Sequence, residues 1–347
     1  MKKQWIGAIL LLFATIIWGV AFVAQTAASD SIGSFTFNAA RSLIAAVLLS
    51  AIVAGKEKIS EKRLIAVGKA YEKSARRKYL KKSLFSGVFC GLALFAAVNF
   101  QQFGIEKYPE GVSASGRAGF LTATYVVIVA AYSAIRHKKL HPVTLISCVG
   151  CLGGMYLLCM HGGVSKIYFG DVLELLGALS FAVQILIVDK YSDFDGVALS
   201  CAQFWTTAVI SAVCAAIFET VRLSDLISAW LPVVYAGVMS SCVGYTFQIL
   251  GQKSVRPAVA SMIMSLESVF AALAGWMILG EKLSGVELLG CALVFVSVIL
   301  SQLSSAGEAS RKEKGEQNIN ADKNSEEKRK NETYDARNGQ RPCDGSV

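Results

Sequence analysis

The segment from residue 257 to residue 303, PAVASMIMSLESVFAALAGWMILGEKLSGVELLGCALVFVSVILSQL, decides the fold class of this protein. It consists of two apolar runs, 257–279 and 284–303, separated by only four residues. Crossing a bilayer core of about 30 Å takes roughly 20 apolar residues in a helix that rises about 1.5 Å per residue. Each run reaches that length. The segment therefore predicts two transmembrane helices joined by a short turn.

Eight further apolar runs of similar length precede this segment. They cover residues 5–28, 34–54, 83–104, 109–135, 142–160, 169–189, 197–218 and 230–251. The composition agrees with this pattern, since 54% of the residues are hydrophobic and 17% are charged, against roughly 45–50% and 25% in soluble proteins. The sequence thus predicts an all-α membrane protein with ten transmembrane helices.

The rest of the sequence leaves no segment for a separate catalytic domain. It consists of short loops, a basic segment at 55–82 and a polar tail from residue 304. No Gly-x-x-x-x-Gly-Lys-Ser/Thr motif is present, which excludes the phosphate-binding loop of an ATP-driven pump. Cys148 and Cys151 have metal-binding spacing but lie inside an apolar run, and we interpret them as helix-packing residues. We expect no cofactor, no metal site and no enzymatic activity.

Lysine and arginine are distributed unevenly between the two sides of the membrane. If the N-terminus is cytoplasmic, 28 of the 34 basic residues fall on the cytoplasmic side and four on the opposite side, while Arg41 and Arg117 lie within spans. Basic residues concentrate in the cytoplasmic loops of membrane proteins. We therefore expect a multi-pass protein with both termini in the cytoplasm, and we attribute the net charge of +9 to topology and not to nucleic-acid binding.

Two polar segments lie on the predicted cytoplasmic side. The segment 55–82 contains 11 basic residues and is predicted to be a loop, which serves either as an interfacial helix on anionic lipid or only as a determinant of topology. The tail 304–347 holds nine basic and nine acidic residues and almost no large apolar ones. That composition is typical of a disordered segment.

The ten predicted spans divide into two halves of five that align with each other. A shift of 146 residues superposes Gln102 on Gln248, and shorter matches occur at shifts of 143 and 163. We place the first five-helix repeat at 1–160 and the second at 161–303. Because five is an odd number, the second repeat enters the membrane from the opposite side. Such inverted repeats are typical of secondary transporters.

Several motifs in these spans resemble those of a known family. They are Trp18-Gly-Val-Ala-Phe-Val23, Arg41-x-x-x-Ala45, Gly116-Arg-Ala-Gly-Phe-Leu-Thr122, Ser265-Leu-Glu-Ser-Val-Phe270 and Leu279-Gly-Glu-Lys-Leu283. On these residues the chain resembles the ten-helix EamA-type branch of the drug/metabolite transporter superfamily. The resemblance covers residues 5 to 303.

The resemblance implies a central cavity between paired repeats, in the cell membrane of a bacterium. The expected function is secondary transport of a small organic metabolite, such as an amino acid or a drug-like compound, by alternating access. An exporter or an exchanger fits this class. The alternatives are a receptor or channel and, less in keeping with the residues, a membrane-embedded enzyme. The expected partners are a small-molecule substrate, the lipid bilayer and protons as a coupling ion; the oligomeric state is left open.

Three charged residues, Arg41, Arg117 and Glu267, lie well inside predicted spans. Glu267 is ten residues from the cytoplasmic start of its span, and hence about 15 Å deep. Charged groups at such depth are costly and are usually functional or paired. Glu267 is therefore either a proton carrier or cation binder, or the structural partner of one of the two arginines. We favour the structural pairing.

Uncharged polar residues supply the rest of the predicted site. Asn99 and Gln102 share one helical face, as do Tyr245 and Gln248, and the repeat relates the two pairs. These faces either line one cavity or form hydrogen bonds between helices. The predicted substrate-binding residues are Trp18, Asn99, Gln102, Arg117, Tyr125, Tyr245, Gln248 and Glu267.

The proline positions give no signal of broken helices. Pro109, Pro142, Pro232 and Pro257 lie at predicted helix starts, where the missing N–H costs nothing. No predicted span has an interior proline, and Ala130 stands where proteins of the resembled family often carry one. We therefore expect neither ion-coordinating helix breaks nor a hinge in the fourth span.

Overall fold

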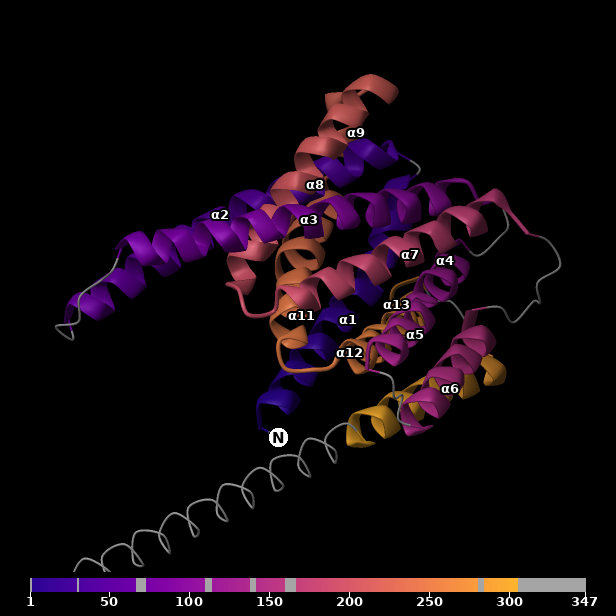
Figure 1. Ribbon diagram of the computed structural model, residues 1–347. Coiled ribbons are helices and arrows are strands. Elements are labelled where there is room, and N and C mark those ends of the chain that lie inside the picture. Colours follow the sequence, from indigo (N-terminus) through magenta and orange to yellow (C-terminus); the bar gives the residue numbers. More distant parts are fainter. Residues whose placement is uncertain are drawn as a thin grey trace, which may run out of the picture. The chain divides into compact units, whose positions relative to one another are not determined.

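The computed structural model describes residues 2–29, 31–66, 73–109, 114–137, 142–159, 167–279 and 284–304. Within these ranges the chain is helical and has no β-strand (Figure 1). The first half contains α1 (Lys2–Ser29), α2 (Ser34–Ala66), α3 (Lys73–Glu106), α4 (Ala114–Ala123), α5 (Tyr125–His137) and α6 (Pro142–Cys159). The second half contains α7 (Phe169–Lys190), α8 (Gly196–Phe218), α9 (Leu223–Ser228), α10 (Trp230–Tyr235), the π-helix η1 (Ala236–Gly244), α11 (Tyr245–Gln252), α12 (Pro257–Met264), α13 (Glu267–Leu279) and a last helix, Gly285–Ser304.

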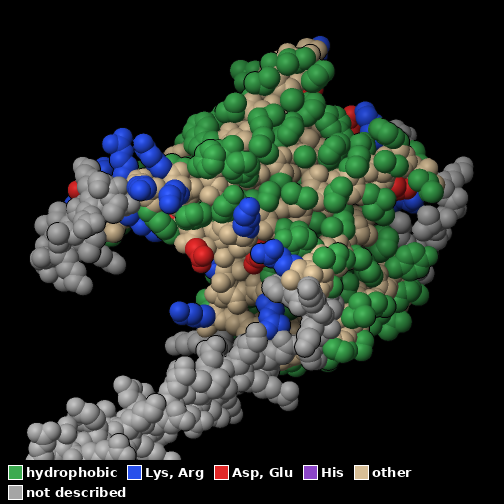
Figure 2. All heavy atoms as spheres, viewed as in Figure 1, with side chains coloured by type: hydrophobic (Ala, Val, Ile, Leu, Met, Phe, Trp, Pro, Cys, Tyr) green, Lys and Arg blue, Asp and Glu red, His purple; other side chains and the backbone are tan. Residues whose placement is uncertain are grey.

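These helices account for the ten predicted spans. Among the described residues, nine helical segments are long and apolar enough to cross a membrane, and the apolar part of α6, Pro142–Leu158, is slightly shorter. Large apolar side chains cover much of the surface seen in Figure 2, as expected for helices whose outer faces meet lipid. The prediction of an all-α membrane protein is confirmed.

The basic segment at 55–82 is mostly helical, which differs from the loop predicted there. α2 continues to Ala66 and α3 begins at Lys73, so both helices project beyond their apolar parts. Arg and Lys side chains gather at that end of the bundle in Figure 2. Residues 67–72 and the tail 305–347, for which disorder is predicted, lie outside the described residues.

Two spans are interrupted near their middle, although the proline positions gave no signal of a break. The fourth span changes from α4 to α5 at Thr124, and the ninth changes from α12 to α13 at Ser265 and Leu266. Tight backbone bonds to the third preceding residue flank both breaks. The hydroxyl groups of Thr124 and Ser265 also donate to the carbonyl of the third preceding residue, at 2.6 and 2.7 Å. Such side-chain bonds bend helices without proline, which is why the proline pattern did not reveal them.

The eighth span contains a different irregularity. The π-helix η1 separates α10 from α11, and π-helical turns leave backbone groups open to other partners. Here the carbonyl oxygen of Ser240 accepts a hydrogen bond from the indole N–H of Trp18, at 3.3 Å. The irregular backbone thus binds the second half to α1 of the first half.

The two halves interleave within the bundle. α1 packs against α11, α12 and α13, while α3 packs against α7 and α8. At the α1–α11 crossing the backbones approach closely, because a Cβ on Gly7 would lie 2.7 Å from the carbonyl oxygen of Gly251, and one on Gly251 would lie 2.8 Å from that of Gly7. Small residues permit such close helix packing in membranes. The interleaving brings the interrupted spans of both halves to the centre.

Candidate solute cavity

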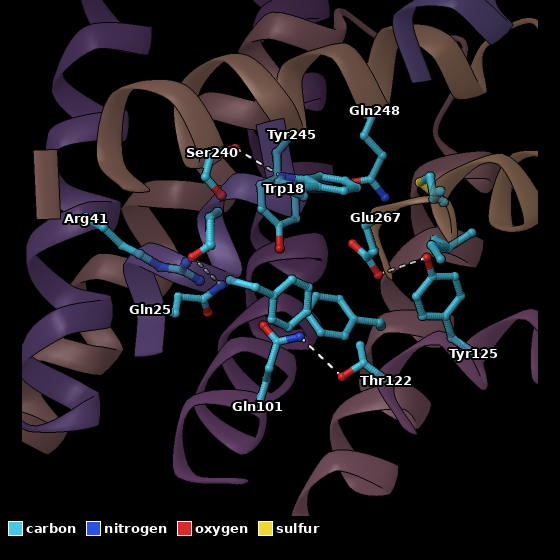
Figure 3. Close-up of a pocket in the computed structure, with 15 residues that line it drawn as sticks. Trp18, Gln25, Arg41, Gln101, Thr122, Tyr125, Ser240, Tyr245, Gln248 and Glu267 are labelled. Atoms are coloured by element: carbon cyan, nitrogen blue, oxygen red, sulfur yellow. Dashed lines mark hydrogen bonds between the residues drawn. The ribbon is translucent and has the colours of Figure 1, made fainter. Parts of the chain in front are cut away.

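A cavity of about 40 Å³ lies at the centre of the bundle (Figure 3). Both halves line it, through Trp18, Ala21, Phe22, Gln25, Arg41, Gln101, Thr122, Tyr125, Phe181, Ile185, Ser240, Tyr245, Gln248, Met264 and Glu267. Pockets for small molecules typically measure about 300–1,000 Å³. At about 40 Å³ this cavity is smaller than such pockets in this conformation.

Arg41 projects from α2 to one side of this cavity (Figure 3). Its side chain is only 2% exposed, and the guanidinium lies 5.5 Å from the centre of the Phe37 ring. The side chain of Arg41 forms no hydrogen bond or ion pair within the described residues, and its Nε atom is buried without a partner there. A buried guanidinium without a counter-charge is costly. Arg41 is thus available to bind an anionic group in the cavity.

Glu267 begins α13 on the other side of the cavity in the same view (Figure 3). Its Oε1 atom accepts a hydrogen bond from the hydroxyl group of Tyr125, at 3.3 Å. Neither Arg41 nor Arg117 forms an ion pair with it within the described part of the chain. The favoured pairing of Glu267 with an arginine is therefore absent from this structure, and its carboxyl group can receive a cationic group or a proton.

Aromatic and amide side chains fill the space between the two charged residues. The rings of Trp18 and Tyr245 are 4.8 Å apart, and this pair forms one wall of the cavity in Figure 3. Gln248 donates to Gln184, which in turn donates to Gln203, each at 3.0 Å. The cavity lining therefore combines a few polar side chains, held in place by hydrogen bonds, with apolar and aromatic side chains between them. Small-molecule sites usually have such a lining.

Comparison with known proteins identifies the family to which this chain belongs. The model of the EamA-like transporter family matches the chain twice, over residues 5–160 and 168–303. This chain belongs to the EamA-like transporter family. An uncharacterized transporter of Archaeoglobus fulgidus is 26% identical over 84% of each chain. The threonine/homoserine exporter RhtA of Salmonella typhimurium is 28% identical over 66% of this chain and 75% of its own.

A solved crystal structure shares the fold, with a TM-score of 0.66 and 17% identity over 86% of this chain and 97% of the other. The family match confirms the resemblance inferred from the motifs. This EamA-like protein is accordingly a multi-pass membrane protein of a transporter family, built from two repeats.

Five of the eight predicted binding residues of this EamA-like protein line the cavity: Trp18, Tyr125, Tyr245, Gln248 and Glu267. Asn99 and Gln102 do not. Asn99 accepts from Asn38 and donates to Ser211, and Gln102 donates to the carbonyl oxygen of Gln25. These bonds join neighbouring helices, so the first of the two related polar faces serves packing while the second faces the cavity.

Arg117, the remaining predicted residue, lies away from the cavity lining. Its guanidinium binds the carboxylate of Asp171 on α7, with 2.6 Å between Nη2 and Oδ2, and covers the ring of Tyr168 at 4.9 Å. The hydroxyl group of Tyr108 also donates to Asp171, at 2.9 Å. Burial, followed by the charges of the nearby acids, raises the pKa of Tyr108 above its ordinary value, so this phenol stays neutral. The cluster ties α4 to α7.

Asp171 and Glu174 are the functional candidates that sequence reasoning missed in this EamA-like protein. Both lie near the start of a predicted span and were not counted as interior charges, yet Asp171 is 5% and Glu174 0% exposed. Their spacing of three residues on an otherwise apolar helix places them on one helical face. That spacing was the available signal.

A second polar cluster lies outside the spans, at the end where α2 and α3 project. The carboxylate of Asp195 caps the start of α8 by accepting from the backbone N–H of Val197 and Ala198, and it binds the ammonium of Lys56 at 2.7 Å. Burial raises the pKa of Asp195, but the bonds from Lys56 and from the helix backbone outweigh burial and hold it below the ordinary value. The carboxylate stays ionised.

Proposed function

We propose that this protein is a secondary transporter that moves a small zwitterionic metabolite, of the amino-acid class, by alternating access through the central cavity. The observation that carries the proposal is a buried guanidinium and a buried carboxyl group, Arg41 and Glu267, that line one cavity without pairing with each other. Together they complement the carboxylate and the ammonium of one solute. The relative RhtA is named as an exporter of threonine and homoserine, which supports this solute class and the direction of export.

The small size of the cavity supports the proposal of alternating access. Its volume of about 40 Å³ is too small for an amino acid, which favours a carrier that changes conformation over an open channel. Two repeats that exchange conformations can open such a cavity first to one side and then to the other. The interrupted spans, where Tyr125 and Glu267 meet, have irregular backbone hydrogen bonds at their breaks, which supports movement of the backbone there.

The test is binding and counterflow with defined solutes. Purified protein is screened by thermal shift against amino acids, nucleosides, sugars and cationic drugs, because a ligand of the folded state raises the melting temperature. Counterflow of labelled L-threonine is then measured in proteoliposomes. We expect zwitterionic amino acids to stabilise the protein and to exchange. Stabilisation by cationic drugs alone, or by no zwitterion, contradicts the proposed solute class.

The variant Arg41→Gln makes this test more specific, because it removes a charge that has no partner within the described part of the chain. The variant is expected to be at least as stable as the wild type, since an unpaired buried charge is lost, and to lose the thermal shift with amino acids. Val296→Ala, at a residue exposed on the last helix, is the matched control and should keep both properties. A variant that still binds amino acids excludes Arg41 from the site.

The proposed orientation has both termini in the cytoplasm of a bacterial cell. It rests on the distribution of basic residues and predicts that a cysteine introduced at Lys69, on a cysteine-depleted background, is shielded from impermeant reagents in intact cells. Labelling of that cysteine from outside contradicts the orientation.

A further inference from the structure

Glu174 is a second buried carboxyl group, and the transport scheme above does not use it. It lies on α7 with 0% of its surface exposed. Its Oε2 atom accepts a hydrogen bond from the hydroxyl group of Thr122, at 2.7 Å, whereas its Oε1 atom has no hydrogen-bond partner among the residues that the structure describes. A Cβ on Gly104 would lie 2.4 Å from that Oε1 atom, so the carboxyl group occupies space that only glycine leaves open.

No cation pairs with this carboxyl group in the described part of the chain. The elements packed against α7 are α3, α4, α5, α11 and α12. The charged or titratable groups close to Glu174 are Asp171 on its own helix, Tyr108 after α3 and Arg117 on α4, and Arg117 binds Asp171. Tyr125 on α5 and Tyr245 on α11 face the cavity instead, and the sequence of α12 has no ionisable residue. An ionised carboxylate buried without a partner is very costly, so this packing suits the neutral acid.

A chain of hydrogen bonds connects Glu174 to the cavity. Gln101 donates to Thr122 at 3.3 Å, and Thr122 donates to Glu174. Gln101 and Thr122 both line the cavity, as Figure 3 shows. Glu174 does not line it and is connected to it through the hydroxyl group of Thr122. A change in the charge of Glu174 therefore reaches the cavity lining through a single side chain.

We propose that Glu174 is the binding site of the coupling proton, separate from the solute-binding groups Arg41 and Glu267. The proton adds to one carboxylate oxygen, and no other bond is made or broken. The neutral acid packs against Gly104 and is compatible with closed contact between α4 and α7. The ionised form needs water or a cation, and both require that contact, held by Arg117 and Asp171, to loosen. Proton binding is thereby linked to closure of the cavity on the α4–α7 side.

This inference rests on the proposed function, and its test separates the two. In proteoliposomes, counterflow of L-threonine requires solute exchange but no proton gradient, whereas accumulation of L-threonine under an imposed pH gradient requires coupling. Glu174→Gln, which mimics the neutral acid, is expected to keep counterflow and to lose gradient-driven accumulation completely. Glu267→Gln is expected to lose both. Glu106→Gln, a partly exposed glutamate at the end of α3, is the matched control and should keep both.

A second measurement does not depend on any solute. Infrared difference spectra of the reconstituted protein, recorded as the pH is raised, report loss of the C=O band of protonated carboxylic acids. We expect Glu174→Gln to remove part of that band in the wild-type and in the Glu267→Gln background alike, and Thr122→Val to shift it. If wild-type counterflow of L-threonine is absent, the proposed solute fails while the infrared result still decides on Glu174. An unchanged band, or accumulation by Glu174→Gln equal to that of the wild type, overturns the proposal.

Discussion

The interrupted fourth and ninth spans have the same backbone construction and different chemistry. Each break has a hydroxyl side chain bonded to the carbonyl three residues earlier, Thr124 in one half and Ser265 in the other. The break is followed by Tyr125 in the first half and, one residue further on, by Glu267 in the second, and these two side chains form a hydrogen bond on one side of the cavity. Both repeats therefore contain the helix interruption, but they differ in the side chain that follows it. A symmetric scaffold can thus hold an asymmetric solute.

The comparison also shows how differently the two breaks are anchored. α4 is fixed to α7 by the buried pair Arg117–Asp171, whereas the described sequence of α12 has no charged residue. Its neighbour α13 contributes Glu267, which is bound by a neutral phenol. The first-half break is thus held by charge and the second by weaker contacts.

The largest effect is expected from breaking the charged anchor of the first half. Asp171→Asn removes the carboxylate that binds the guanidinium of Arg117, and removal of one partner of a buried pair costs about 3–5 kcal/mol. The free energy of unfolding in detergent should fall by about 3 kcal/mol. The double variant Arg117→Gln/Asp171→Asn should recover part of this loss, as a double-mutant cycle would report. Equal destabilisation by the single and double variants would show that the pair itself is not the anchor.

Glu267→Gln tests the weaker anchor of the second half. Because its carboxyl group is bound by Tyr125 and not by an arginine, the free energy of unfolding should change by about 1 kcal/mol or less. Binding of amino acids, measured by thermal shift, should be lost. Tyr125→Phe is the control that removes the same hydrogen bond and keeps the carboxyl group. A loss of about 3 kcal/mol for Glu267→Gln would instead indicate pairing with an arginine.

A matched pair of variants asks whether the two breaks act alike. Thr124→Val and Ser265→Ala each remove a hydroxyl group that bonds a backbone carbonyl, at an expected cost of about 0.5–1.5 kcal/mol. Both should slow counterflow and increase the protection of nearby backbone amides from hydrogen exchange, because the helix becomes more regular. If only one variant changes the protection of backbone amides from hydrogen exchange, the two hydroxyl groups do not have the same effect on the helix backbone.

The smallest effect is expected far from both breaks, at Asp195. Its pKa is held below the ordinary value of 3.8 by Lys56 and the start of α8, so its contribution to stability is complete above that value and is lost as the pH falls through the lower folded pKa. Lys56 is about half exposed, and such pairs contribute about 1 kcal/mol or less. Melting curves of the wild type and Asp195→Asn should therefore converge in acid. A constant difference down to the lowest pH would assign the effect to helix capping alone.

Residues 257–303 and the other apolar runs were sufficient to predict the fold class. Spans of about 20 apolar residues have few alternatives to a transmembrane helix, because every backbone polar group must be bonded within the membrane. Local motifs such as Ser265-Leu-Glu-Ser were likewise sufficient to identify the family. The sequence also singled out Trp18, Tyr125, Tyr245, Gln248 and Glu267, all of which line the cavity.

Only the tertiary structure decided which charges are paired. Arg41 and Arg117 are indistinguishable as isolated arginines in apolar spans, and the difference arises because α7 brings Asp171 to Arg117, while among the described residues no carboxylate pairs with Arg41. The same holds for the first polar face, where Asn99 meets Asn38 instead of the cavity. Depth along a helix follows from residue number, whereas the direction in which a side chain points depends on how helices far apart in the chain pack together. That packing placed Arg41 and Glu267 around one cavity and left Glu174 directly behind it.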